Sequence, residues 1–123
     1  MGGWKFLDKV SMVVNDAKHP CYKFNLAITE TGYSQLYKIP FTNKFKSRSE
    51  AEMAEWYKNN LTFLQNYMLK FNSSNYSKYL FITIYQLYDQ NGHIVDPEAK
   101  FGLFKDDLKT PKAAVSVIKS LLL

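Results

Sequence analysis

The longest regular pattern in the chain is an apolar stripe that predicts a helix over residues 49–72. Its members recur every three or four positions, as one face of an α-helix requires: Met53, Tyr57, Leu61, Leu64, Met68 and Phe71. Ser49 and Glu52 precede the stripe with the S-x-x-E spacing of a capping box, in which each side chain binds the other residue's backbone amide. The polar residues that begin at Asn72 predict the end of this helix.

Two shorter patterns of the same kind predict helices at the two ends of the chain. Over residues 4–18, apolar positions recur at helical spacing, and Pro20 follows as a stop signal. Over residues 110–122, Thr110 is the expected N-cap and Pro111 the expected first-turn residue. Both helices are amphipathic, so each has an apolar face that must pack against another element.

Two segments have the patterns of β-strands. Residues 22–29 alternate between apolar and other positions, which predicts a strand. Residues 79–88 form an almost continuous apolar run without polar alternation. Such a run is typical of a strand buried on both faces, and therefore of a parallel sheet covered by helices.

The predicted order is α-β-α-β-α, which defines an α/β fold class with two parallel strands joined by a right-handed crossover. The length of 123 residues fits a single domain over 1–123. Segments 33–48 and 89–109 are expected to be long loops, and loops of this length are often functional.

Aromatic residues are abundant, with nine Tyr, nine Phe and two Trp. They supply either a bulky core or flat platforms for sugar rings and nucleobases. The net charge of +5 raises the question of nucleic acid, but the lysines are dispersed. The cluster Lys44, Lys46 and Arg48 fits a solvated loop better than a phosphate-binding surface, so no nucleic-acid partner is expected.

The remaining residue types point to no metal and no cofactor. Cys21 is the single cysteine, so the chain forms no internal disulfide. His19 and His93 have no metal-ligand spacing. No apolar run is long enough to span a membrane, so no membrane partner is expected, and the composition does not fix a cellular compartment.

The stretch LAITETGYS, residues 26–34, resembles the seventh barrel strand of the TIM-barrel retaining glycoside hydrolases grouped as clan A. Members related to β-xylosidases, endoglucanases and mannanases carry a similar hydrophobic-T-E-x-G-aromatic stretch at that position. The resemblance implies that Glu30 is the catalytic nucleophile. Taken without the resemblance, Glu30 fits a capping or solvated carboxylate equally well.

A second group of stretches resembles the eighth strand, its loop and the closing helix of the same family. These stretches are IYQLYD at 84–89, EAKFGLF at 98–104 and DLKTPKAA at 107–114. Family members often read aromatic-E/Q-L-x-D, E-x-x-F-G-L and P-K-P-A there, and Ala113 replaces the second Pro. The resemblance implies a partial (β/α)8 barrel consisting of the seventh and eighth units, with 4–18 as the sixth helix.

In a barrel the active site lies at the carboxyl ends of the strands, where Glu30 is expected. By strand alternation Glu30 shares a face with Leu26 and Ile28, and that face is expected to point into the barrel. A retaining enzyme needs a second carboxyl group about 5 Å from the nucleophile.

Four further residues are candidates for substrate contact. The resemblance implies that Tyr85 and Tyr88 form an aromatic platform, and Tyr33 and Gln86 are placed to contact hydroxyl groups. Core packing or surface exposure is an equally good interpretation for all four. The aspartates after the second strand are expected to be turn residues: Asp89, Asp106 and Asp107.

The family's acid/base residue follows the fourth strand as an Asn-Glu pair, and this chain contains no counterpart. Before the first strand the only Asn is Asn15, followed by Asp16 within a predicted helix. The chain is therefore expected to need the missing barrel half, from copies of itself or from a partner chain, before it acts on β-linked carbohydrate. The alternative is a non-catalytic interaction or structural subunit that reuses barrel elements.

Overall fold

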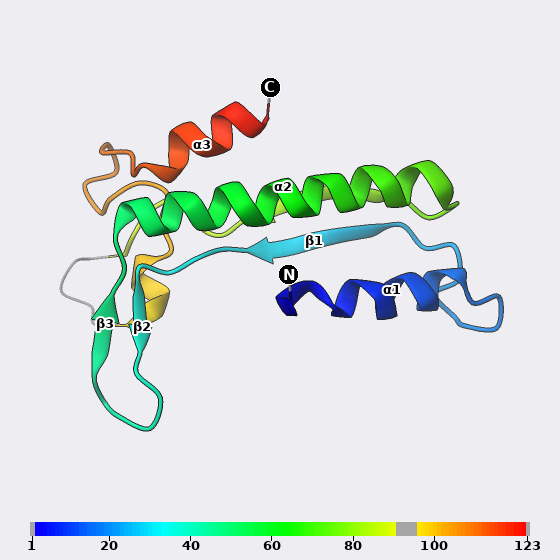
Figure 1. Ribbon diagram of the computed structural model, residues 1–123, viewed down its shortest axis with the longest axis horizontal. Helices are drawn as coiled ribbons and strands as arrows, with labels where there is room; N and C mark the ends of the chain where they lie inside the picture. Colours follow the sequence, from blue (N-terminus) through cyan, green and yellow to red (C-terminus); the bar gives the residue numbers. More distant parts are fainter. Residues whose placement is uncertain (1, 91–95, 123) are drawn as a thin grey trace.

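The computed structural model describes residues 2–90 and 96–122 and has a mixed α/β architecture (Figure 1). The described part contains three α-helices: α1 (Phe6–Asn15), α2 (Glu50–Ser74) and α3 (Ala114–Leu121). Its strands are β1 (Leu26–Thr31), β2 (Leu36–Lys38), β3 (Phe45–Ser47) and β4 (Tyr79–Ile84). Two short 3-10 helices, η1 (Gly2–Trp4) and η2 (Pro97–Lys100), complete the described elements.

Strands β1 and β4 pair in parallel, which confirms the prediction that the two main strands are parallel neighbours. The paired Cα positions are Leu26 with Tyr79, Ile28 with Ile82, and Thr31 with Ile84. The register shifts twice along this short ladder, once on each side of the Ile28 pair. Helix α2 runs along the sheet and connects the two strands (Figure 1).

The beginning of α2 is the element that the sequence predicts best. The Glu52 backbone N–H donates to Ser49 Oγ at 3.0 Å, and the Ser49 backbone N–H donates to Glu52 Oε1 at 3.5 Å. The predicted capping box is therefore confirmed. Five of the six stripe residues are buried: Met53, Tyr57, Leu61, Leu64 and Phe71.

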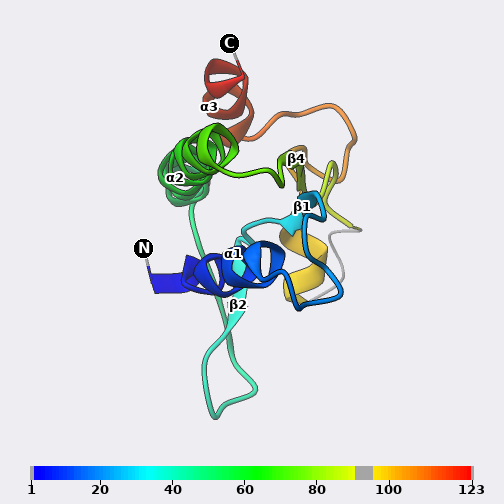
Figure 2. The same ribbon diagram turned by 90° about the vertical axis from the view of Figure 1, so that its right-hand side faces the viewer.

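Helix α2 contributes to two separate apolar clusters. The first joins α1, α2 and the sheet through Leu7, Val14, Leu64, Phe71 and Tyr79, with Leu26, Ile28 and Ile82 packed against it. The second joins α2 and α3 through Met53, Tyr57, Leu61, Ala114 and Ile118. Figure 2 shows the three helices on one side of the β1–β4 pair, so a single face of this sheet carries the core.

The expected orientation of β1 is wrong in one respect. Leu26 and Ile28 pack towards the helices instead of pointing into a barrel interior. The register shift after Ile28 also interrupts the alternation, because Thr31 is buried whereas the preceding Glu30 is exposed. A β-bulge changes which side chains face which side, and simple alternation cannot anticipate it.

The expectation for β4 also needs correction. The strand ends at Ile84 instead of continuing to residue 88, and it is not buried on both faces. Leu80 and Phe81 are 61% and 52% exposed. The apolar run is typical of a strand with two covered faces, whereas the described part of the chain covers one.

Residues 33–48 are not a plain loop, since they contain the antiparallel hairpin of β2 and β3. Residues 22–25 lie in turn and irregular backbone, so β1 begins four residues later than the predicted strand. Segment 89–109 contains η2, and its turn signal Asn91-Gly92 lies outside the described residues.

The terminal helices are shorter than predicted. Helix α1 ends at Asn15, and α3 begins at Ala114 with Ala113 as its N-cap. Thr110 instead binds Asp107, whose Oδ1 accepts the Thr110 backbone N–H at 2.8 Å. The side-chain and backbone hydrogen bonds from Thr110 lower the pKa of Asp107 to about 2, so Asp107 is a turn residue as expected.

Within residues 2–90 and 96–122, no helix combines the length and the apolar character needed to cross a membrane.

Candidate functional site at the carboxyl end of the sheet

The parallel pairing brings the carboxyl ends of β1 and β4 to the same end of the molecule. The Tyr85 backbone N–H donates to the Thr31 carbonyl at 2.9 Å and closes the ladder at this end. The β2–β3 hairpin and η2 lie beyond the same end, on the left in Figure 1. Residues that follow both strands are therefore gathered at one edge of the sheet.

Gly32 allows two backbone segments, one after β1 and one after β4, to approach each other at this end of the sheet. A Cβ at this position would collide with the Tyr85 carbonyl oxygen and would press on the Phe101 ring. The backbone of Gly32 does not adopt a positive φ. Glycine is therefore required here for the close approach of the Tyr85 backbone, because any other residue would bring a Cβ against it.

Glu30, Tyr85 and Glu98 form the polar group at the strand ends. The Tyr85 hydroxyl donates to Glu98 Oε2 at 3.4 Å. Partial burial raises the pKa of Tyr85, and the negative charges of Glu98 and then Glu30 raise it further. Tyr85 therefore keeps its proton at neutral pH, and the carboxylates of both Glu98 and Glu30 act on it.

Glu98 is the residue of this group that the sequence did not single out as a site candidate. It occurs in the stretch EAKFGLF, which resembles the family's loop after the eighth strand. Its position is set by η2, where Asp96 Oδ1 accepts the Glu98 backbone N–H at 2.9 Å. A carboxylate within a loop motif gives no signal that it returns to the strand end, because that return depends on tertiary structure.

Gln86 and Tyr88 make contacts of a more structural kind. Gln86 Nε2 donates to the Glu98 carbonyl at 3.1 Å, which ties the end of β4 to η2. The Tyr88 ring packs against Phe104 with 5.9 Å between ring centroids, and these two residues also form an isolated parallel bridge. Tyr88 is 38% exposed, so part of its ring faces solvent.

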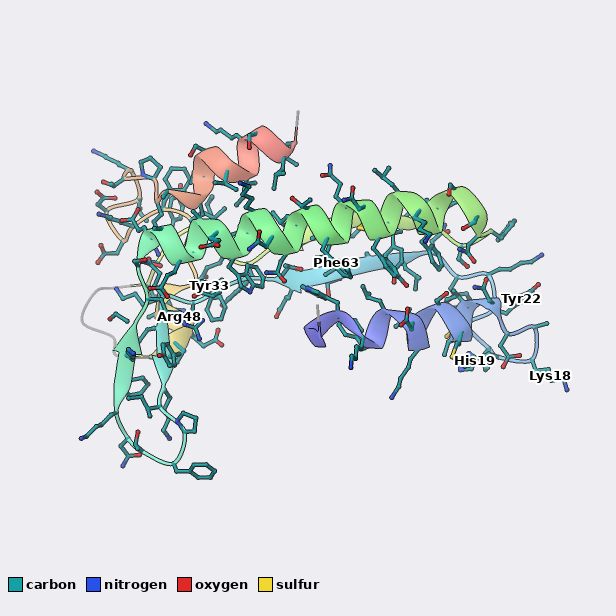
Figure 3. The ribbon with its side chains drawn as sticks, in the orientation of Figure 1. Lys18, His19, Tyr22, Tyr33, Arg48 and Phe63 are labelled. Carbon is teal, nitrogen blue, oxygen red and sulfur yellow. The ribbon has the colours of Figure 1, made fainter. Side chains whose placement is uncertain are left out.

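Tyr33 belongs to a row of stacked side chains beside the hairpin. Its ring lies 5.5 Å from the Trp56 ring, and the Arg48 guanidinium carbon lies 4.6 Å from the Tyr33 ring centroid. The same guanidinium carbon lies 4.2 Å from the Tyr37 ring centroid. Figure 3 shows Tyr33 and Arg48 together at the base of the hairpin.

This row borders an open hollow of about 710 Å³. Other lining residues come from the loop after β1 and from the region of η2, among them Ser34, Pro97 and Phe101. Ser34 Oγ donates to the Pro97 carbonyl at 2.6 Å and joins these two segments. Of the predicted contact residues Tyr33 lines this hollow, whereas Arg48 was expected in a solvated loop.

A buried ion pair lies near the start of α3. Lys112 Nζ is 2.8 Å from Asp89 Oδ1, and the two side chains are 2% and 7% exposed. Asp89 Oδ1 also accepts the Gly102 backbone N–H at 2.9 Å. Burial lowers the pKa of Lys112, and the hydrogen bond to Asp89 opposes this shift. Asp89 therefore has a structural role beyond the turn, because it joins Lys112, just before α3, to the backbone of Gly102, just after η2.

Metal chemistry finds no support in the described residues. Among them, no three His, Cys, Asp or Glu side chains come together in a way that could hold a metal ion. The side chains available at the strand ends are carboxylates, tyrosine hydroxyls and an amide. These groups can act in nucleophilic and acid/base chemistry.

Comparison of the chain with protein-family models, with curated proteins and with solved structures finds no match.

Proposed function

We propose that this chain is the carboxyl-terminal part of a barrel-type retaining glycoside hydrolase, with Glu30 as its nucleophile. The observation that carries the proposal is an exposed Glu30 at the end of β1, beside the parallel β4 and within electrostatic reach of Tyr85. The resemblance of residues 26–34 to the family's nucleophile strand supports it. Barrel enzymes build their active sites at this end of the strands.

The chemistry assigned to Glu30 is a double displacement on a β-linked carbohydrate. Its carboxylate attacks the anomeric carbon and forms a glycosyl ester, while the bond to the leaving-group oxygen breaks and that oxygen takes a proton. Water then attacks the same carbon, gives a proton to the group that protonated the leaving oxygen, and releases the sugar and the Glu30 carboxylate. The proton donor for the first step is supplied by the remainder of the barrel, from another chain or another copy.

The other proposed contacts follow from the geometry at the strand ends. Tyr85 keeps its proton and offers its hydroxyl beside the sugar, in a position set by the hydrogen bond to Glu98. Tyr33 and Tyr88 present aromatic rings to the substrate, and Gln86 holds η2 in place.

A second candidate is a non-catalytic interaction subunit that reuses barrel elements. The observation that favours it is the exposed apolar surface of β4 at Leu80 and Phe81. Such a surface fits a protein contact whether or not Glu30 takes part in catalysis. The two candidates differ in whether Glu30 forms a covalent bond with a sugar.

Covalent trapping tests the nucleophile without the missing acid. A 2-deoxy-2-fluoroglycosyl fluoride loses fluoride without protonation, and its fluorine at carbon 2 slows release of the sugar from the enzyme. We expect β-configured gluco-, xylo- or manno-probes to add one fluorosugar mass to the peptide that contains Glu30. The label should disappear in Glu30→Gln and remain in the matched Glu98→Gln. Labelling elsewhere, or no labelling with any of these probes, would reject Glu30 as the nucleophile.

A further inference from the structure

The row formed by Tyr37, Arg48, Tyr33 and Trp56 differs from a purely aromatic platform, because it contains a cation. An aromatic ring face can support the apolar face of a sugar, but here a guanidinium packs over two of the rings. Cation–π contacts use the face of a guanidinium, whereas its N–H donors point outwards in its plane. The contacts with the two rings therefore restrain the guanidinium and leave its N–H groups able to form hydrogen bonds.

The backbone around Arg48 is held independently of its side chain. The Arg48 backbone N–H donates to the Gln35 carbonyl at 2.6 Å, and Gln35 Nε2 donates to the Arg48 carbonyl at 3.1 Å. Within the described part of the chain, the Arg48 guanidinium forms neither a side-chain hydrogen bond nor an ion pair within 4.0 Å. The residue is thus positioned, and it lines the hollow with a guanidinium that has no acceptor among the described residues.

The charged residues that line the hollow are all cations. Its charged lining residues are Arg48 and Lys38, and every lining residue belongs to the described ranges, with no acidic side chain among them. Arg48 also borders a second hollow of about 310 Å³, in which three acidic residues, Glu50, Asp89 and Asp106, accompany three lysines. Of the two hollows that Arg48 lines, the aromatic one is therefore the one whose lining contains cations and aromatic rings but no carboxylate.

This hollow lies next to the end of the strands. Tyr33 follows Glu30 by three residues, and Phe101 lines the hollow while its ring lies 5.5 Å from the Tyr85 ring. A saccharide that reaches Glu30 can therefore extend over Tyr33 and Trp56 towards Arg48.

We propose that the hollow binds a sugar residue that carries an anionic group, either a carboxylate or a sulfate. The sugar ring packs on Tyr33 and Trp56, and the anion pairs with the outward edge of the Arg48 guanidinium. Such an edge matches two oxygens of a carboxylate or sulfate at once. The inference rests on the proposed function, since it names the class of glycoside that the same site takes.

Three glycosides that differ only at carbon 6 provide the test: methyl β-D-glucoside, its 6-sulfate and methyl β-D-glucuronide. Binding to the full chain is followed through the Trp56 indole N–H in ¹H–¹⁵N spectra, with the indole of Trp4 as an internal reference. We expect at least one anionic glycoside to bind about tenfold more tightly than the neutral one, which corresponds to about 1.4 kcal/mol. The preferred anion separates a uronate site from a sulfate site.

Variants assign the preference to Arg48. Arg48→Gln should remove it while keeping the backbone hydrogen bonds to Gln35, and Arg48→Lys should retain only part of it, because lysine lacks the planar fork. The matched control is Lys44→Gln, which removes an exposed cation of the hairpin that does not line the hollow. Spectral dispersion equal to that of the wild type verifies that each variant is folded.

Four results would overturn the inference. They are equal affinity for the three glycosides, a preference that survives Arg48→Gln, binding of inorganic sulfate or acetate as tight as that of the glycosides, and tighter binding of a short single-stranded oligouridylate. None of these results affects covalent trapping at Glu30, so failure of this inference is distinguishable from failure of the proposed function.

Discussion

The two faces of the β1–β4 sheet differ although the same two strands form both. On the helix side, Leu26, Ile28 and Ile82 pack against the cluster that contains Leu64. By contrast, Leu80 and Phe81 of β4 are exposed, as are Ala27 and Thr29 of β1. The difference shows that the sequence of β4 suits a strand with two covered faces, whereas the described chain covers one.

Exposed apolar area of this kind has an energetic consequence. Full burial of a Leu or Phe side chain contributes about 1.5–3 kcal/mol relative to exposure, so a partner that covers this face gains from both residues. Two apolar hollows of about 300 Å³ each leave further apolar surface accessible beside the helices. One lies between α2, α3 and β4, and the other lies between α1 and the start of β1. Open sheet edges and apolar surface together favour association.

The largest difference between the two faces should appear when the same substitution is made on each. Leu64 is fully buried under the sheet, and Leu64→Ala should lower the free energy of unfolding by about 2–5 kcal/mol. Leu80 is 61% exposed, and Leu80→Ala should change it by less than about 0.5 kcal/mol in the dissociated chain. Urea denaturation at the lowest practical protein concentration measures both values. Equal losses at the two positions would remove the distinction between the faces.

Gly32 marks the point where the paired strands end and the site begins. Gly32→Ala places a Cβ against the Tyr85 carbonyl, so we expect a loss of about 1–3 kcal/mol in urea denaturation and displacement of the Tyr85 backbone. Gly3→Ala is the matched control, because a Cβ at Gly3 meets no atom within 4 Å. If the two variants were equally stable, the close approach at the strand ends would be incorrect.

Tyr79 provides a pH-dependent test of the covered face. Its ring is 5% exposed, its hydroxyl has no hydrogen-bond partner among the described residues, and burial raises its pKa from 10.0 to about 12. The folded chain therefore holds this proton longer than the unfolded chain, and its contribution to stability is lost as the pH rises from about 10 to about 12.

Tyr79→Phe should make that alkaline loss shallower, and Tyr57, whose pKa burial also raises to about 12, is among the tyrosines that supply the remainder. At neutral pH the same variant should match the wild type or gain up to about 1 kcal/mol, because an unpartnered buried hydroxyl is removed. Unfolding free energies measured from pH 7 to 12 check both expectations, with the exposed Tyr76→Phe as control. An unchanged alkaline slope in Tyr79→Phe would mean that Tyr79 is not buried as described.

The smallest expected effect is on catalysis. Under the proposed function, the purified chain alone should not turn over aryl β-glycosides, because it lacks the acid/base residue whose contribution is about 10²–10⁴-fold. Release of the aryl group is the measurement. Turnover by the chain alone that disappears in Glu30→Gln would disprove this expectation.

Local patterns predicted the parts of the fold that depend on local physics. The apolar stripe and the Ser49–Glu52 pair predicted α2 and its capping box, and the apolar run predicted a strand in a parallel sheet. The bulge that exposes Glu30 beside the buried Thr31 depends on the register between two distant strands, so strand alternation missed it.

The site illustrates the same limit. Glu30 and Tyr33 follow a recognisable strand, and the sequence could single them out. Arg48 looked like a member of a solvated basic cluster, and Glu98 like a loop residue, because stacking on Tyr33 and the contact with Tyr85 form only after the hairpin and η2 fold back. Burial of Lys112 against Asp89 is likewise a tertiary event, since a lysine in a polar segment gives no sign of it.

The most direct test of the account is the mass of the chain in solution at micromolar concentration, determined by sedimentation velocity. The account predicts a species heavier than the 14.3 kDa monomer, which Phe81→Lys dissociates by placing a charge at an exposed apolar position of β4. Tyr76→Lys, at an exposed position outside β4, should leave the species unchanged. A compact, stable wild-type monomer of 14.3 kDa would contradict the conclusion that the exposed apolar surface of β4 is built to be covered.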